Sequence, residues 1–101
     1  ANIRQAAALH SQGEVIYWSY GNSEPPRAKK MAEIMSTSSG YALDVPVGIA
    51  DGGGFKDWFI TEFRRPGFTI ELGTGKNPLP AADAEKIYMR VRKMLMLFIM
   101  M

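Results

Sequence analysis

The apolar positions of the chain change their period from one segment to the next, and each period predicts a different kind of element. Val15–Tyr20 is rich in β-branched and aromatic residues, which is typical of a strand. Phe68–Leu72 alternates apolar and polar side chains without a break, so a second strand with one buried face is expected there. Ala6–His10 is a short apolar stretch before a polar turn, and we interpret it as a further strand that ends at His10.

Helical spacing occurs in three other segments. Apolar side chains recur at this spacing over Ala28–Met35, with Ser23 as the expected N-cap and Gly40 as the expected stop. Phe55–Phe63 places phenylalanines at i, i+4 and i+8, which predicts a short second helix. A long third helix is expected from Ala84 onward, because apolar residues line one side of that segment.

The last eight residues, Met94–Met101, are all apolar. A helix that spans a membrane needs about 20 such residues, so this run does not predict a membrane anchor. We expect it to be a helix end that is buried on most sides. The stretch Ala1–Ala8 has neither a basic start nor a long apolar run, so no secretory signal is expected.

Strands that alternate with helices predict an α/β architecture, and a length of 101 residues suits one domain. The segment Gly40–Gly54 is expected to be mostly loop, with Val45–Ile49 too short and too interrupted by glycine and proline to assign. Two or three strands with three helices make a thin sheet with uncovered edges. The number of expected elements is therefore closer to half of a domain than to a complete one.

Composition and charge exclude several kinds of site. With 47% hydrophobic and 22% charged residues, the chain has the composition of a globular protein. The absence of cysteine excludes disulfides and thiolate metal sites, and a single histidine excludes metal sites that need two imidazoles from this chain. A net charge of +2 is too small to indicate nucleic-acid binding without a clustered basic patch.

Several features could carry chemistry, and each also has a plainer interpretation. The single histidine, His10, is either a ligand or a hydrogen-bonded structural residue, and Glu71 either faces solvent or acts in a cleft as a general acid or base. Gly52–Gly54 could cradle a phosphate before a helix, but the GxGxxG spacing is missing, which favours a flexible loop. Ser11 and His10 are strand neighbours that point to opposite faces, which excludes a hydrolase pair. Arg27–Lys30 is interpreted as a solvated helix face.

Four blocks of sequence occur in an order that resembles the zinc carboxypeptidases. They are LHSQGEVIYW (Leu9–Trp18), GGFKDWF (Gly53–Phe59), EFRRPGFTIELG (Glu62–Gly73) and NPLP (Asn77–Pro80). Within that family the blocks are most similar to the bacterial γ-D-glutamyl-L-diamino acid endopeptidases, which cut peptidoglycan stem peptides. The resemblance extends over nearly the whole chain from Leu9 onward.

The resemblance implies roles for individual residues. In the family a His-Ser pair that ends a strand supplies the third zinc ligand, which places that role on His10. The glutamate of the FTIEL strand is the family's general base, and it corresponds to Glu71. Ser11 and Lys56 are implied in substrate binding, Lys56 because it precedes the Asp-Trp pair of the specificity pocket. The implied cofactor is one zinc ion in the full-length enzyme.

The implied reaction is metal-assisted hydrolysis of the bond from γ-D-glutamate to diaminopimelate or lysine in a cell-wall muropeptide. Zinc would lower the pKa of a bound water toward about 7, and Glu71 would take a proton from that water and pass it to the leaving amine. We hypothesise that Lys56 pairs with the distal carboxylate of diaminopimelate; the alternative is that it begins a helix and points into solvent. The resemblance suggests the cell envelope, the spore or the cell exterior as the location.

The chain also departs from the family pattern. The family's first two zinc ligands, a His-x-x-Glu pair, and the arginine region that binds the substrate carboxylate lie upstream and are absent here. Gapless counting places Ile49 at the position of the mobile tyrosine of pancreatic-type members, and Tyr41 lies far from that position. We therefore interpret residues 1–101 as the C-terminal half of a peptidase domain with a mixed sheet and flanking helices. By itself it is not expected to hold zinc or to be active.

A rival interpretation is a non-catalytic α/β module that binds peptide or assembles with itself. A sheet that is cut in the middle leaves an unpaired strand edge, and Met94–Met101 adds apolar surface. Self-association is therefore expected under either interpretation. A His-x-x-Glu pair encoded before Ala1 would favour the enzyme.

Overall fold

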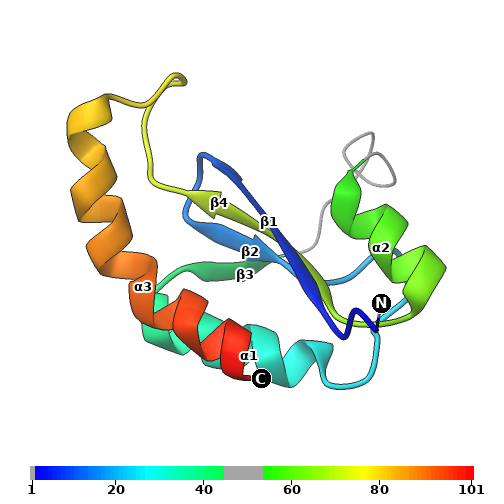
Figure 1. Cartoon of the computed structure of the whole chain (residues 1–101). Helices are drawn as coiled ribbons and strands as arrows, with labels where there is room; N and C mark the ends of the chain where they lie inside the picture. The colour runs from blue at the N-terminus through cyan, green and yellow to red at the C-terminus, as the bar shows by residue number, and fades with distance from the viewer. Residues whose placement is uncertain (1, 45–53) are drawn as a thin grey trace.

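The computed structural model describes residues 2–44 and 54–101 of the chain. In chain order its elements are β1 (Ala6–Ser11), β2 (Val15–Tyr17), α1 (Ala28–Ser39), β3 (Ala42–Asp44), α2 (Phe55–Phe63), β4 (Gly67–Leu72), the 3₁₀ turn η2 (Ala81–Asp83) and α3 (Ala84–Met100). The α/β content predicted from the alternating periods is confirmed (Figure 1). None of the described helices is long and apolar enough to cross a membrane.

The four described strands form one mixed sheet in the order β1-β4-β2-β3. β1 runs parallel to β4, β2 runs antiparallel to β4, and β2 and β3 are parallel. The alternating segment Phe68–Leu72 belongs to β4, which is therefore paired on both sides. Within the described sheet, β1 and β3 are the outer strands.

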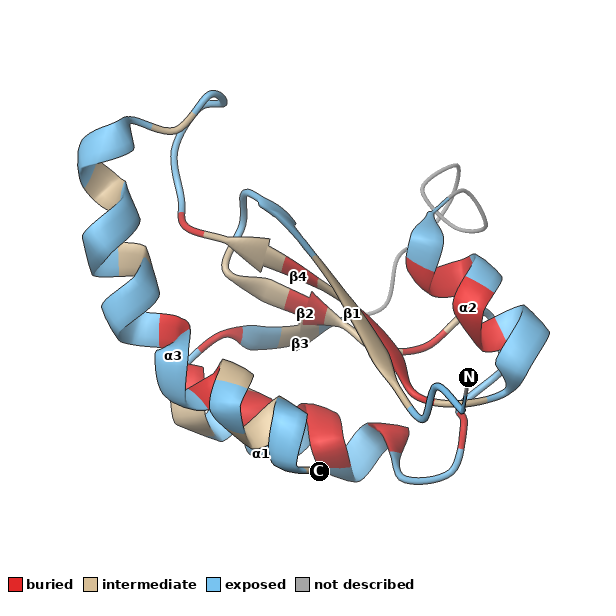
Figure 2. Ribbon diagram, viewed as in Figure 1, coloured by how far each residue is buried: buried red, intermediate tan, exposed pale blue. Residues whose placement is uncertain are grey.

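The core lies between the sheet and the helices α1 and α3, and Figure 2 shows buried positions on these elements and also along α2. Phe68 of β4 points to this face, and its ring meets Phe98 of α3 edge-on with centroids 6.0 Å apart. Helix α2 packs against the start of β4, since a methyl group added at Gly67 would lie 3.0 Å from Phe59. Because Gly67 and Phe68 project to opposite sides of the strand, α2 covers the other face of the sheet. The buried core consists of Ile16, Met31, Ala32, Met35, Tyr41, Phe68, Ile70, Val91 and Met94.

The predicted strand Val15–Tyr20 is longer than the strand in the structure. β2 stops at Tyr17, and Tyr20 forms an isolated bridge with Ser23. The prediction of Ser23 as the N-cap of α1 is therefore wrong. Arg27 occupies that position, in a left-handed conformation with a φ of 73°.

The predicted end of α1 is confirmed, because Gly40 forms the left-handed C-cap with a φ of 78°. The strand β3 follows at once, inside the segment Gly40–Gly54 that the sequence predicts to be mostly loop. Its three residues are too few to show a period. Val45–Ile49 lies outside the described residues.

The prediction that Met94–Met101 is buried on most sides is wrong. Met94 is fully buried, but Ile99 and Met100 are 78% and 77% exposed. Helix α3 packs on α1 through a single stripe, which contains Val91 and Met94. The outward-facing residues at the end of α3 therefore stay in contact with solvent.

The aromatic spacing predicts the bounds of α2 correctly but not its buried face. Phe59 is buried, whereas Phe55, Trp58 and Phe63 are largely exposed. The exposed rings contact one another, and Trp58 meets Phe63 edge-on with centroids 5.7 Å apart. The rest of the buried face consists of Lys56, Asp57 and Ile60.

Candidate functional site

His10 and Glu71 are paired across the neighbouring parallel strands β1 and β4. Residues paired in this way project to the same face of a sheet, so the imidazole and the carboxylate lie side by side. Each is one residue from the end of its strand, since β1 ends at Ser11 and β4 at Leu72. The crevice outside the carboxyl ends of the strands is where open α/β sheets bind their ligands.

The surroundings of this pair leave it open to a ligand. On the far side of Glu71 the sheet continues with Val15 of β2, and a methyl group added at Gly13 would lie 3.7 Å from the Glu71 Cβ. Glu71 is half-buried and His10 is exposed. Within residues 2–44 and 54–101 neither side chain forms a hydrogen bond or an ion pair. Both groups are therefore available for chemistry at one end of the sheet.

Ser11 is held by the loop that follows β4. Its hydroxyl donates to Asn77 Oδ1 at 2.8 Å, and Asn77 Nδ2 donates to the Ser11 main-chain oxygen at 3.3 Å. In the register Ser11 is paired with Leu72, so it belongs to the face opposite His10. The contact with Asn77 fixes the strand end next to His10. A role for Ser11 in substrate binding stays a prediction.

Lys56 is buried, with 3% of its surface exposed. Its ammonium donates to the Ser19 main-chain oxygen at 2.5 Å, forms a close ion pair with Asp57 and lies 5.9 Å from the centroid of the Tyr20 ring. The alternative that Lys56 points into solvent is therefore wrong, because α2 turns it toward the segment after β2. Pairing with a substrate carboxylate would require the substrate to reach this buried ammonium, and it stays a prediction.

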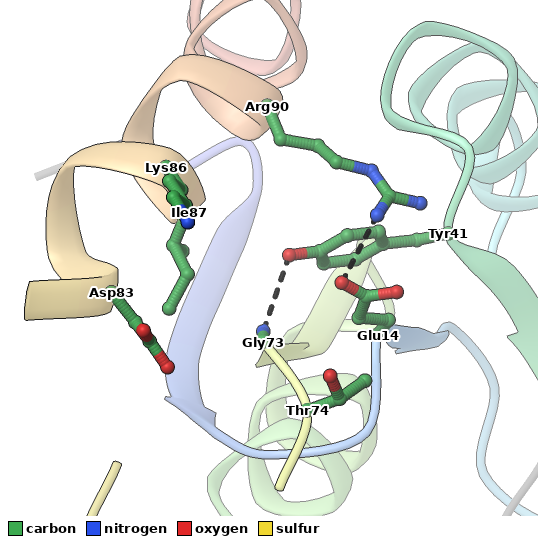
Figure 3. A pocket seen from close by; sticks show the side chains of 8 residues that line it. All are labelled: Glu14, Tyr41, Gly73, Thr74, Asp83, Lys86, Ile87 and Arg90. Atoms are coloured by element: carbon green, nitrogen blue, oxygen red, sulfur yellow. Dashed lines mark hydrogen bonds and ion pairs between the residues drawn. The ribbon is translucent and has the colours of Figure 1, made fainter. Parts of the chain in front are cut away.

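A pocket of about 260 Å³ lies beyond the end of β4 (Figure 3). The side chain of Arg90 from α3 lines this pocket and extends toward Glu14 and Tyr41. Arg90 Nη1 donates to Glu14 Oε2 at 3.1 Å, and the guanidinium lies 5.4 Å from the centroid of the Tyr41 ring. The Tyr41 hydroxyl accepts a hydrogen bond from the Gly73 N–H at 3.3 Å. These contacts tie α3 to the turn between β1 and β2 and to the chain that leaves β4. These contacts therefore hold the segment that follows Glu71 in place.

Sequence reasoning missed the contacts around this pocket, because Arg90 and Glu14 are 76 residues apart and no local pattern links them. Tyr41 is only 1% exposed, which does not fit a mobile active-site tyrosine. Ile49, the other position considered for that tyrosine, lies outside the described residues. The glycines Gly52 and Gly53 also lie outside them, and Gly54 is the N-cap of α2.

The described part of the chain offers one imidazole to a metal ion. His10 stands exposed at a strand end, and imidazole nitrogen is a common zinc ligand. Over residues 2–44 and 54–101, no group of three or more His, Cys, Asp or Glu side chains could hold a metal ion. The described residues therefore do not complete a metal site by themselves, and His10 is the imidazole that they could contribute to one.

Comparison with known proteins gives two curated relatives, while no family model matches the chain. Gamma-D-glutamyl-L-diamino acid endopeptidase 1 of Lysinibacillus sphaericus is 49% identical over 88 residues, which cover 86% of this chain and 22% of that enzyme. The uncharacterized protein YqgT of Bacillus subtilis (strain 168) is 41% identical over 81 residues, which cover 80% of this chain and 22% of that protein. The chain thus spans about a fifth of the length of these relatives, and it is homologous to a segment of a peptidase.

Proposed function

We propose that this chain is the segment of a carboxypeptidase-type zinc metallopeptidase that supplies one zinc ligand, His10, and the general base, Glu71. The observation that carries the proposal is the pairing of these two residues at the carboxyl ends of parallel strands. A metal ligand and a general base have to serve the same water molecule. Neighbouring strands about 4.8 Å apart hold the two side chains close enough for that.

The similarity to a γ-D-glutamyl-L-diamino acid endopeptidase supports the γ-D-glutamyl-diamino acid bond as the bond that is cleaved. We propose that the whole protein cleaves this bond in a cell-wall muropeptide and acts in the cell envelope, in the spore or outside the cell. Because the chain spans 22% of that relative, the remaining zinc ligands would come from other parts of the whole protein.

The residues of this chain would divide the chemistry between them. When bound, zinc would polarise the scissile carbonyl and lower the pKa of a coordinated water toward about 7. His10 would hold the metal through one ring nitrogen, at a strand end that Ser11 and Asn77 fix. Glu71 would accept a proton from the attacking water and return it to the leaving amine. The half-buried position of Glu71 at the sheet end lets its carboxylate meet a substrate without a change of fold.

The sheet edge favours a second candidate function. β1 is an outer strand of the described sheet, and its residues Ala6–Leu9 are apolar. Such an edge pairs readily with another strand, so a non-catalytic module would use it to bind an extended peptide or a second copy of itself. The two candidate functions differ in one respect: the peptidase requires the Glu71 carboxylate, and the non-catalytic module does not.

A chimeric enzyme tests the proposal. The segment of the L. sphaericus endopeptidase that matches this chain is replaced by the chain, and the purified chimera is assayed on a γ-D-glutamyl-diaminopimelate peptide. With 49% identity over the matched residues, we expect a folded chimera that holds zinc and cleaves that bond. A folded chimera that holds zinc and cleaves nothing would favour the non-catalytic module.

A further inference from the structure

Four arginines surround a hollow at the N-terminal ends of β1 and β4. His10 and Glu71 lie near the opposite ends of these two strands. The hollow has a volume of about 400 Å³ and is lined by Arg4, Arg27, Arg64 and Arg65, together with Asn2 and two prolines. Figure 1 shows three segments that meet there: the N-terminal segment before β1, the chain that enters α1 and the turn from α2 into β4. None of the described residues that line the hollow is acidic.

Hydrogen bonds orient two of the four guanidiniums. Arg65 Nη1 donates to Asn2 Oδ1 at 2.7 Å and to the Ile3 carbonyl oxygen at 2.6 Å, and Arg27 Nη2 donates to the Met101 main-chain oxygen at 2.9 Å. A guanidinium has five N–H donors, so both keep donors for a ligand. The side chains of Arg4 and Arg64 form no hydrogen bond or ion pair with another described residue.

The start of α1 adds further positive charge next to Arg27. The first turn of this helix contains Lys29 and Lys30 but no acidic residue, and its N-cap makes no side-chain hydrogen bond. A helix N-terminus carries a partial positive charge, which acidic side chains usually balance. A second hollow adjoins this one and is also lined by Arg64. Among the described residues that line the two hollows, Glu24 is the one that is acidic. The described residues that line the two hollows therefore carry four positive side chains and one negative side chain.

We propose that this hollow, the arginine pocket, binds a phosphate-bearing ligand with two or more negative charges. Arginine matches phosphate oxygens with paired N–H donors, and its charge persists at all physiological pH values. The tetrahedral oxygens of phosphate point in several directions, so donors from three chain segments can converge on them. A planar carboxylate offers only two oxygens. The volume lies within the range of small-ligand pockets, about 300–1,000 Å³.

The arginine pocket is separate from the pair His10 and Glu71. The strand starts Ala6 and Gly67 are paired four residues before that pair, which is about 13 Å at a rise of about 3.3 Å per residue. A ligand in the pocket would leave the other strand ends free. Phosphate binding in this pocket is independent of the proposed peptidase function.

Calorimetric titration of the chain with inorganic tripolyphosphate at an ionic strength of about 0.15 M, where the Debye length is about 8 Å, tests the proposal. The double variant Arg4→Gln/Arg64→Asn removes the two guanidiniums that have no partner among the described residues. Asparagine tolerates the left-handed backbone of Arg64, whose φ is 51°. We expect the affinity to fall about 100-fold, since each lost charge-assisted hydrogen bond costs about tenfold.

A matched control removes two positive charges elsewhere. The variant Arg92→Gln/Lys93→Gln changes two exposed residues of α3 outside the arginine pocket, and it should bind within about twofold of the wild type because distant surface charges are screened. Equal losses in the two double variants would overturn the proposal, since they would mean general attraction to a basic protein. An absence of binding to the wild type would overturn it as well.

A second ligand and a second variant complete the test. Citrate should bind at least tenfold more weakly than tripolyphosphate, and equal binding would overturn the assignment to phosphate. If Arg4→Gln/Arg64→Asn fails to fold, Arg4→Lys/Arg64→Lys keeps both charges and removes the forked donors. We expect that variant to lose about tenfold in affinity. Unchanged affinity would contradict a pocket built on guanidinium geometry.

Discussion

At the residue scale, the candidate chemistry depends on which face of its strand each side chain occupies. Glu71 lies on the face opposite Phe68 and Ile70, which are buried in the core, and its paired neighbour on β1 is His10. The carboxylate is thus held by a strand that is packed on one face and paired on both sides. A general base needs such a fixed position, because proton transfer requires hydrogen-bond distance to the water.

One prediction at this scale concerns zinc binding by the chain itself. Catalytic zinc usually has three protein ligands, and His10 with Glu71 supplies fewer than that. We expect calorimetry to detect no stoichiometric zinc binding at micromolar concentrations. Binding of that strength that disappears in His10→Ala would show that the chain completes the site, within one copy or between two.

A second prediction concerns Lys56. Its ammonium is buried against Asp57 and Ser19, so Lys56→Met breaks a buried ion pair and should lower the free energy of unfolding by about 3–5 kcal/mol in urea denaturation. The control Lys29→Met changes an exposed lysine of α1 and should stay within about 0.5 kcal/mol of the wild type. An equally stable Lys56→Met would contradict the structural role.

The chimera separates this structural role from the hypothesis about specificity. The quantity to compare is kcat/KM on matched diaminopimelate and lysine peptides, with and without Lys56→Met. A pairing with the distal carboxylate would change the ratio by roughly 5- to 150-fold, and an unchanged ratio would discard it.

At the element scale, the long periodic segments could be predicted and the short ones could not. α1, α2 and β4 follow from apolar spacing, because each is long enough for its buried face to leave a pattern. The exposed aromatic face of α2 could not be predicted, since the choice of buried face depends on how α2 packs against β1 and β4. β3 is too short to leave a pattern.

The end of β4 yields a prediction about Gly73. This glycine has a φ of 69°, and an added methyl group would lie 2.8 Å from Ile87 and 2.9 Å from Leu79. Gly73→Ala should therefore destabilise the chain by about 1–2 kcal/mol, measured by thermal unfolding. Gly21→Ala is the control, because its φ of 55° is also left-handed but nothing lies within 4 Å of its added methyl group, so it should lose less stability. Equal melting temperatures for both variants would contradict the strain assigned to Gly73.

The outer strand β1 yields a prediction about self-association. Light scattering after size exclusion should show a dimer or a larger species at tens of micromolar, because an apolar edge strand pairs with another chain. Leu9→Lys places a charge on this strand, where Leu9 is 48% exposed, and should give a monomer. Ile99→Lys tests the exposed end of α3 instead and should leave the association unchanged. A monomeric wild type, or dissociation by Ile99→Lys only, would contradict pairing through β1.

At the scale of the whole molecule, the α/β class could be predicted but the strand order could not. β4 is the last strand in the sequence, yet it lies between β1 and β2. No local pattern records this insertion, which is what brings Glu71 beside His10 and gathers four arginines at the other strand ends. The roles of His10 and Glu71 could be anticipated only through the family resemblance. The net charge of +2 does not indicate that four arginines gather in one pocket.

The central claim is that Glu71 is the general base of a zinc peptidase, and the turnover of the Glu71→Gln chimera tests it most directly. The amide keeps the shape of the side chain but does not accept a proton from water, so kcat should fall by about 10²- to 10⁴-fold while the zinc content stays unchanged. The control Glu33→Gln, at an exposed position of α1, should keep the turnover of the parent chimera. Full turnover in Glu71→Gln, or loss of its zinc, would contradict the role assigned to this carboxylate.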